Sequence, residues 1–226
     1  MLKLLHVFIA VGTVVVLAAN LAAGAVDGKE TERIAKAAAV LHEIHAQSDK
    51  DVPQGLWTKA ACVVVVPSVK KGAFIVGGEY GRGLMSCRQS GTWSGPVFMQ
   101  LEKGSVGLQI GGEEVDLLLL VMNEGGMQKL LGDKVTLGAE ASVAAGPVGR
   151  DTQAATDAQL HAEILSYSRA AGVFAGLDLS GGVLKPDKDA TRDLYGKSME
   201  AKTVLMTTSV KAPAAADPFM NALTAR

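Results

Sequence analysis

The stretch AEILSYSRAAGVFAGLDLSGG, residues 162–182, has an unusual composition for a piece of folded chain. Small Ala and Gly residues separate single apolar side chains. The stretch therefore has too few large groups for an ordinary core strand and too few Ser and Pro residues for a linker. Residues 162–169 and 173–179 are expected to pair as a β-hairpin around Ala171 and Gly172. A backbone with so few large side chains leaves room for another element to lie directly on it.

Towards the N-terminus, residues 27–47 have the apolar period of a helix. Its apolar stripe is formed by Ile34, Ala38, Leu41 and Ile44. The charges of this helix are mixed, which favours packing on the domain over lying on an anionic membrane. Further short helices are expected at residues 54–60, 124–131 and 187–194, and at the C-terminal end.

Strands are expected between these helices, in segments that are rich in β-branched residues or that alternate between apolar and polar residues. They are residues 62–66, 73–80, 84–88, 97–101, 106–110, 115–122 and 134–145. The first is expected to be buried on both faces and to end at Pro67, and Gly81-Arg82-Gly83 separates the second from the third. Gly111 and Gly112 are expected to form a bulge or turn. Because there is no internal repeat and no long linker, the pattern predicts one α+β domain over residues 26–226.

The first 25 residues have the pattern of a secretory signal peptide. A positive start at Lys3 precedes a nearly continuous apolar run, residues 4–19. Small residues then stand at the −3 and −1 positions of a cleavage after Ala25. The alternative is an uncleaved membrane anchor, since the apolar run approaches the length that spans a bilayer. Cleavage would give an exported domain, either periplasmic or secreted.

Charge and cysteine content narrow the partners and the compartment. The formal net charge is −1, so there is no electrostatic reason to expect nucleic acid as a partner. The chain has two cysteines, Cys62 and Cys87, and export would place them in an oxidising compartment. A disulfide between them and a pair of buried free thiols are both compatible with the sequence.

Signatures of catalysis are missing from the sequence. It has no Gly-x-Ser-x-Gly elbow and no phosphate loop, and the glycines around Arg82 lie between two strands instead of opening a helix. His42 and His45 lie one helical turn apart without a visible third ligand, so a solvated helix face is expected rather than a zinc site. We therefore expect a protein that is not an enzyme and that needs no metal or cofactor.

Five blocks of the sequence resemble the SYLF domain, also called the Ysc-type actin-binding or lipid-binding domain, in order and spacing. The blocks are GTWSGPVF (91–98), SVGLQIGGEEVDLLLLVMN (105–123), KVTLGAEASVAAGPVGR (134–150), AEILSYSRAAGVFAGLDLSGGVL (162–184) and LYG (194–196). The likeness covers about residues 34–196. With its signal segment, the chain is similar to exported bacterial members of the family.

The resemblance implies a non-enzymatic lipid-binding protein of the bacterial cell envelope, with a phospholipid or membrane surface as its partner. It also implies an alternative, because fungal relatives are associated with actin filaments. The alternative is a protein-interaction or assembly module that binds another envelope protein or a second copy of itself. A bent or barrel-like antiparallel sheet needs Gly and Ala where strands bend or where another element lies on the backbone. We therefore expect such a sheet with an N-terminal amphipathic helix and short C-terminal helices.

Exposed basic side chains are the expected contacts to headgroup phosphates. The candidate residues, which include one aromatic, are Lys70, Lys71, Arg82, Arg88, Arg150, Tyr167 and Arg169. Arg169 follows Tyr167 by two residues, which places both side chains on one face of a strand. A buried unpaired guanidinium is costly, so Arg169 must reach solvent, a bound phosphate, or an acid such as Glu163 or Asp178.

Overall fold

The computed structural model describes residues 27–46, 52–73, 76–106, 113–148, 161–170 and 173–225. The strands are β1 (Cys62–Ala73), β2 (Val76–Gln89), β3 (Thr92–Trp93), β4 (Val97–Val106), β5 (Glu113–Val121), β6 (Val135–Thr136), β7 (Val143–Ala145), β8 (Ile164–Ala170), β9 (Val173–Gly176) and β10 (Val183–Pro186). The helices are α1 (Gly28–Ala46), α2 (Gln54–Lys59), α3 (Glu124–Leu130), α5 (Lys188–Tyr195), α6 (Ala201–Met206) and α7 (Asp217–Thr224). A short 3-10 turn, Ala214–Ala216, precedes α7.

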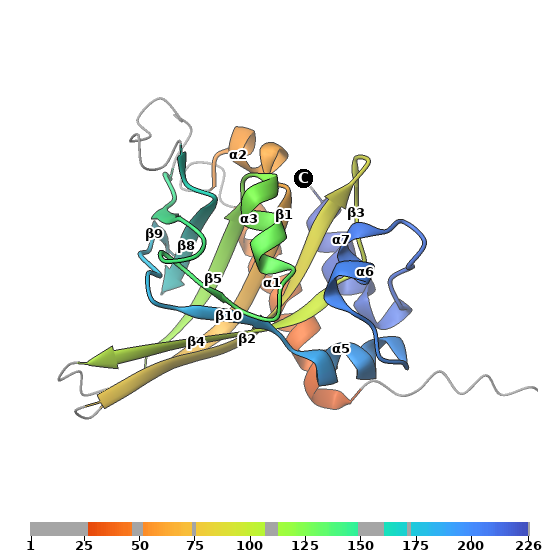
Figure 1. Cartoon of the computed structure of the whole chain (residues 1–226), viewed down its shortest axis with the longest axis horizontal. Coiled ribbons are helices and arrows are strands. Elements are labelled where there is room, and N and C mark those ends of the chain that lie inside the picture. Colours follow the sequence, from red (N-terminus) through yellow and green to blue (C-terminus); the bar gives the residue numbers. More distant parts are fainter. Residues whose placement is uncertain are drawn as a thin grey trace, which may run out of the picture.

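The strands join in one strongly curled sheet, a half-barrel with helices on both faces (Figure 1). The strand order is β6-β10-β4-β2-β1-β5-β8-β7, with β3 paired to β2 and β9 paired to β8. The pairing is antiparallel throughout this order except between β7 and β8. The α+β class, the bent sheet and the short C-terminal helices are therefore confirmed.

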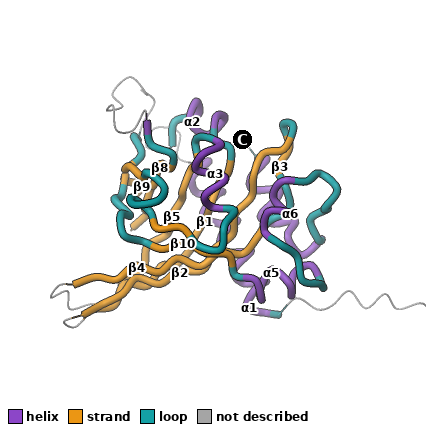
Figure 2. The backbone as a smooth tube through the Cα atoms, in the orientation of Figure 1, coloured by secondary structure: helices purple, strands orange, loops and turns teal. Residues whose placement is uncertain are grey.

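Alternate residues of β1 enter two separate cores, which explains why this strand is apolar throughout its first half. Val63 and Val65 pack towards α1, α2 and α7, whereas Val64 and Val66 pack towards α3 and α6. All four side chains are fully buried. Figure 2 shows the helices on both sides of the strands.

The N-terminal helix α1 matches its expected stripe, because Ile34, Ala38, Leu41 and Ile44 are all buried. The expectation of two solvated histidines is wrong for one of them. His42 is exposed, whereas His45 is half-buried and its ring meets Trp57 edge-on at 4.9 Å between centroids. Within the described residues, no helix combines the length and the apolar character needed to cross a membrane.

The prediction of one continuous strand over residues 134–145 is wrong. The segment contains two short strands, β6 and β7, separated by a turn in which Gly138 has a φ of +82°. The carboxylate of Glu140 closes this turn by accepting the Thr136 N–H at 2.7 Å. Leu137 and Ala141, on either side of this turn, pair through an isolated β-bridge and are both buried. The apolar alternation in the sequence therefore continues through the turn.

Two expected strand ends are also wrong. Gly81-Arg82-Gly83 does not separate two strands, because β2 runs through it unbroken. Pro67 does not end β1, which continues to Ala73 past a β-bulge between Val66 and Val69. Proline is tolerated in a sheet at a bulge, where no ladder N–H is needed. The expected strand 106–110 lies almost wholly outside the described residues, as do Gly111 and Gly112.

Gly176 of the stretch 162–182 and Gly146, which precedes the stretch, lie where the chain packs closely beside the Tyr167 ring. Strands β8 and β9 form the expected hairpin, in which Tyr167 pairs with Gly176. The ring of Tyr167 lies so close to Gly146 that a Cβ there would overlap it. A Cβ on Gly176 would likewise meet the carbonyl oxygen of Gly146 at 2.7 Å. The glycines therefore allow close packing at the edge of the curled sheet.

Cys62 and Cys87 face each other on β1 and β2 and form a disulfide, with their Cα atoms 3.9 Å apart. The Arg88 N–H donates to the Ala61 carbonyl at 2.7 Å, which makes the cysteines a non-hydrogen-bonded pair. Side chains approach most closely at such pairs. Of the two alternatives left by the sequence, the structure has the bridge. The signal segment lies outside the described residues.

Candidate functional site

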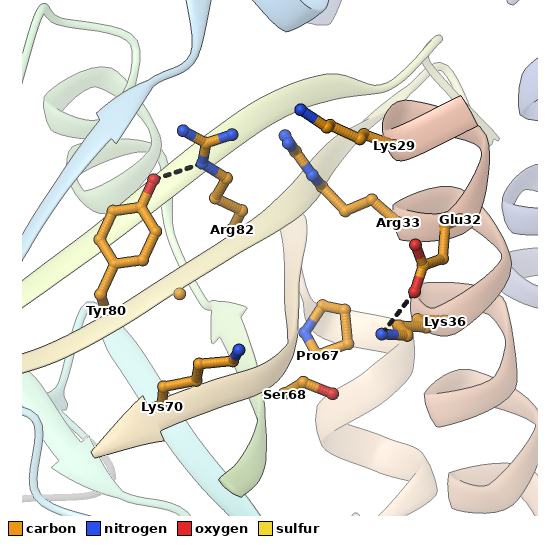
Figure 3. A pocket seen from close by; sticks show the side chains of 10 residues that line it. Lys29, Glu32, Arg33, Lys36, Pro67, Ser68, Lys70, Tyr80 and Arg82 are labelled. Atoms are coloured by element: carbon orange, nitrogen blue, oxygen red, sulfur yellow. Dashed lines mark hydrogen bonds and ion pairs between the residues drawn. The ribbon is translucent and has the colours of Figure 1, made fainter. Parts of the chain in front are cut away.

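A pocket of about 290 Å³ lies between the first turns of α1 and the middle of β1 and β2 (Figure 3). We call it the basic pocket. Its lining residues are Lys29, Glu32, Arg33, Lys36, Pro67, Ser68, Lys70, Tyr80, Gly81 and Arg82. Five of these carry a positive charge and one carries a negative charge. The described chain thus collects cations at this place although its total charge is close to zero.

Helix α1 supplies three of the cations, which are spaced at the period of the helix. Lys29, Arg33 and Lys36 follow each other at steps of four and three residues, so they lie along one side of the helix. The opposite side of α1 is buried in the core. The helix therefore packs on the domain, as expected, and its polar side forms one wall of the basic pocket.

Strand β2 supplies Tyr80 and Arg82 on one face, because they are two residues apart. The Arg82 Nε donates a hydrogen bond to the Tyr80 hydroxyl, and the guanidinium lies 5.6 Å from the ring centroid (Figure 3). This hydrogen bond raises the pKa of Arg82 above its ordinary value. Both side chains are exposed, so Tyr80 holds a charged guanidinium at the open side of the pocket.

The cations of the basic pocket differ in how far acids neutralise them. Arg33 is buried and bonds Glu30 and Asp187 at 3.3 Å each. Lys36 bonds Glu32 at 2.8 Å, which lowers the pKa of Glu32. Two further cations, Lys29 and Arg82, form no ion pair with any acid of the described chain. Lys70 contacts Glu114 only at 4.0 Å, and both side chains are exposed. Lys29, Lys70 and Arg82 are therefore the charges that remain available to an anion.

The bulge in β1 forms the floor of the pocket. Ser68 has a φ of +50°, which is uncommon for a residue other than glycine. Its N–H donates to the Asp116 Oδ1 at 2.9 Å. Burial raises the pKa of Asp116, and the bond from Ser68 opposes this shift. The Asp116 carboxylate on β5 therefore holds the strained residue in place.

Arg169 binds the other oxygen of the same carboxylate. Its Nε and Nη2 donate to the Asp116 Oδ2 at 3.0 and 2.6 Å, and it also pairs with Glu43 of α1. An acidic partner was expected, but Glu163 and Asp178 were the wrong acids. Residue 169 stands opposite residue 116 in the β5–β8 register, so Asp116 is within direct reach.

Glu163 and Asp178, the two acids expected to pair with Arg169, accept hydrogen bonds from other residues. Glu163 accepts bonds from Lys129 at 2.7 Å and from the Ser142 N–H at 2.9 Å. Asp178 accepts bonds from the N–H and hydroxyl of Ser180, two residues on. Both interactions fasten loops beside the sheet, and neither carboxylate belongs to the basic pocket.

Close backbone contact explains the two glycines on either side of Arg82. A Cβ on Gly81 would meet the side chain of Val69 at 2.7 Å, and a Cβ on Gly83 would overlap the Val65 carbonyl oxygen. Strand β2 therefore crosses the bulged part of β1 with glycines facing it. The side chain between them, Arg82, points to the other face and into the pocket.

Of the candidate residues, the structure brings only Lys70 and Arg82 together in the basic pocket. Tyr167 is fully buried in the core beneath α1, so a contact from its side chain to a headgroup is excluded. Arg169 is committed to its ion pairs, and Arg88 lines a different pocket. Lys71 lies on β1, but its side chain is outside the described set, and Arg150 is outside the described residues altogether.

The sequence reasoning missed Lys29, Arg33, Lys36 and Tyr80. The first three had a signal, namely basic residues at helical spacing on one side of α1. It was obscured because the acidic residues of the same helix made its total charge look mixed. Tyr80 had no signal of its own, because only the fold shows that its hydroxyl meets Arg82.

Comparison with known proteins identifies the family. A family model described as "Ysc84: Las17-binding protein actin regulator" matches residues 102–226, more than half of the chain. The chain belongs to the Ysc84 family. The SYLF resemblance is therefore confirmed. The matched part of this Ysc84-family chain includes Asp116 and Arg169, whereas all residues that line the basic pocket precede it.

Individual relatives agree with the family. The chain is 37% identical over 180 residues to an SH3 domain-containing protein of Schizosaccharomyces pombe, covering 77% of this chain and 41% of the relative. It is 30% identical over 183 residues to protein YSC84 of Saccharomyces cerevisiae, covering 79% and 39%. It is 31% identical over 169 residues to SH3 domain-containing YSC84-like protein 1 of Xenopus laevis, covering 72% and 50%. The chain spans half or less of the length of these relatives.

The names of the family and its members describe regulation and protein binding, not catalysis. A further Saccharomyces cerevisiae relative, 29% identical over 183 residues, is called LAS seventeen-binding protein 3. A role in protein interaction therefore fits the family. These relatives come from eukaryotes.

Proposed function

We propose that this Ysc84-family domain binds phosphate-bearing lipid headgroups at a membrane surface through the basic pocket. The observation that carries the proposal is the gathering of five cations around one pocket, with Arg82 held at its open side by Tyr80. Arginine and lysine bind phosphate through charge-assisted hydrogen bonds. A volume of about 290 Å³ is close to the lower end of the range for small-ligand pockets. The pocket thus suits a headgroup rather than an acyl chain.

Vesicle co-sedimentation tests this proposal. We expect binding to vesicles that contain phosphatidylserine or phosphoinositide, and little binding to pure phosphatidylcholine. The double variant Lys70→Gln/Arg82→Gln should weaken anionic vesicle binding by about tenfold or more, since each cation near the surface contributes roughly 1 kcal/mol. The matched control Lys134→Gln/Lys202→Gln removes the same charge from exposed positions elsewhere and should bind almost as well as wild type. Equal losses in both variants would contradict a role for the pocket.

Export to an oxidising compartment is the second part of the proposal. The signal-like segment of residues 1–25 supports it, and so does the disulfide between Cys62 and Cys87. We expect the protein isolated from its own cells to begin at Val26 and to contain no free thiol. Mass spectrometry of the intact protein checks both points. A retained segment would favour a membrane-anchored domain, and free thiols would contradict the oxidising location.

The alternative function is protein interaction, which the names of the relatives favour. In an exported domain the partner would be another envelope protein or a second copy of this chain. Cross-linking in cells distinguishes the alternatives, because a lipid-binding domain needs no specific protein partner. A single cross-linked partner that is lost in Lys70→Gln/Arg82→Gln, without any vesicle binding, would assign the basic pocket to protein recognition.

A further inference from the structure

A second pocket lies further along β2, away from the basic pocket. It has a volume of about 460 Å³ and is bounded by α2, the β2–β3 hairpin and α7. We call it the tryptophan pocket, after Trp57 and Trp93 in its wall. Met220 of α7 adds apolar surface, with Leu223 buried behind it, and Arg88 is the one charged residue among the described residues that line the pocket.

The hairpin that builds this pocket is fixed by its turn. Ser90 and Gly91 have φ values of +49° and +87°, as in the two-residue turns that suit the twist of antiparallel strands. The turn pairs Arg88 with Trp93 across the hairpin. The guanidinium consequently lies 4.1 Å from the centre of the Trp93 ring. Trp57 of α2 completes the wall, with its ring centre 6.2 Å from that of Trp93.

Arg88 has unused hydrogen-bonding capacity in this place. It is half-buried, and the hydrogen bond of its guanidinium within the described chain is a long one, from Nη2 to the Trp57 carbonyl at 3.4 Å. Its Nε is shielded from solvent and has no hydrogen-bond partner there. Burial lowers the pKa of Arg88, and no acid of the described chain forms an ion pair with it that would oppose this shift. A guanidinium in such surroundings favours an anionic ligand.

We propose that the tryptophan pocket binds a small organic acid, with one carboxylate on Arg88 and a flat apolar body against Trp93 and Met220. A guanidinium presents paired N–H groups that match a single carboxylate. Trp93 and Met220 contact the body of the ligand, and Trp57 and Leu223 are buried behind them. The volume lies within the usual range for small-molecule sites. A phosphate dianion, by contrast, suits the several cations of the basic pocket.

Tryptophan fluorescence gives a direct test, because Trp57 and Trp93 are the two tryptophans of the whole chain and both line this pocket. Phenylacetate is the probe, and phenylacetamide is its neutral match. We expect a saturable fluorescence change with phenylacetate and binding at least about tenfold weaker with phenylacetamide, since the amide lacks the charge-assisted contact. Arg88→Met should lose phenylacetate binding, whereas Arg82→Met in the basic pocket should retain the wild-type affinity.

The comparison of acid and amide uses the wild-type protein, so it stands even if Arg88→Met fails to fold. Equal affinities for phenylacetate and phenylacetamide would overturn the proposal. So would a phenylacetate response that persists in Arg88→Met with a wild-type thermal transition, or the absence of any saturable response to phenylacetate. A response to inorganic phosphate alone would also overturn it. Because the two pockets share no lining residue, these outcomes are independent of vesicle binding.

Discussion

Arg169 and Asp116 face each other across β8 and β5, and two guanidinium nitrogens of Arg169 bond one oxygen of Asp116 at 3.0 and 2.6 Å. The other oxygen of Asp116 accepts the N–H of Ser68 in the floor of the basic pocket. The arginine of the Tyr-Ser-Arg sequence is thereby linked to the pocket through one carboxylate. Its role in this arrangement is to hold the bulge of β1, without contact to a ligand.

Replacing Arg169 should therefore act first on stability. Arg169→Ala leaves Asp116 half-buried without its cation, which should cost about 2 to 4 kcal/mol of unfolding free energy. Arg169→Lys should recover part of this loss, because a lysine keeps the charge but cannot reproduce the paired geometry. Urea unfolding measures both. Arg192→Ala, which removes two exposed ion pairs, is the control and should cost less than about 1 kcal/mol. An Arg169→Ala protein as stable as wild type would contradict the structural role.

Tyr80→Phe should separate ligand binding from stability. The variant removes the hydroxyl that accepts the bond from Arg82 and leaves the exposed ring in place. Unfolding free energy should change by less than about 0.5 kcal/mol, as for most surface substitutions. Affinity for anionic vesicles should fall severalfold, because Arg82 loses its fixed position. Unchanged vesicle affinity would show that Arg82 needs no positioning by Tyr80.

Gly83→Ala should be strongly destabilising, because the added Cβ overlaps the backbone of β1 at Val65. Overpacking of this kind costs about 1 to 3 kcal/mol, and contact with backbone leaves little room for relaxation. Gly104→Ala on β4 is the matched control, since no atom lies within 4 Å of its added Cβ. Thermal unfolding should show a clear drop for Gly83→Ala only. Similar melting temperatures for both variants would refute the close approach of β1 and β2.

Glu163 should make stability depend on pH in the acid range. Hydrogen bonds from Lys129 and Ser142 hold the pKa of Glu163 below its ordinary value. A lowered pKa in the folded state means that the carboxylate stabilises the fold above its unfolded pKa, and that this contribution is lost as the pH falls through the folded pKa. Glu163→Gln should therefore be less stable than wild type near neutral pH, by about 1 to 2 kcal/mol.

The difference between Glu163→Gln and wild type should shrink as the pH falls below the ordinary glutamate range. Unfolding curves at several pH values measure this convergence. Glu140→Gln is a useful comparison, because hydrogen bonds with Thr136 lower the pKa of this exposed glutamate as well. A stability difference for Glu163→Gln that stays constant down to acid pH would assign the effect to packing instead of charge.

Local patterns predicted the elements whose signals are local. The stripe of α1 and the hairpin of β8 and β9 follow from apolar period and turn residues within one segment. The prediction of one strand over residues 134–145 was wrong because apolar residues can alternate through a turn when the residues on both sides of the turn are buried. Pro67 and Gly81 were each expected to interrupt a strand. A β-bulge accommodates Pro67 within β1, and the close approach of β1 requires a glycine at position 81 of β2.

The candidate site was less predictable, because it depends on contacts between distant segments. Asp116 stands 48 residues from Ser68 and 53 from Arg169, so only the sheet register reveals their shared role. Lys70 and Arg82 were predictable as exposed cations. That they meet the basic side of α1 is a result of how the helix packs across the sheet.

The most direct test of the central claim is to map where a soluble headgroup binds. Inositol trisphosphate should be titrated into isotopically labelled protein while backbone amide shifts are followed by NMR. We expect saturable shifts concentrated at Ser68, Lys70 and Arg82 and in the first turns of α1, and their loss in Lys70→Gln/Arg82→Gln. Saturable shifts that cluster elsewhere, or that persist unchanged in this variant, would contradict binding at the basic pocket.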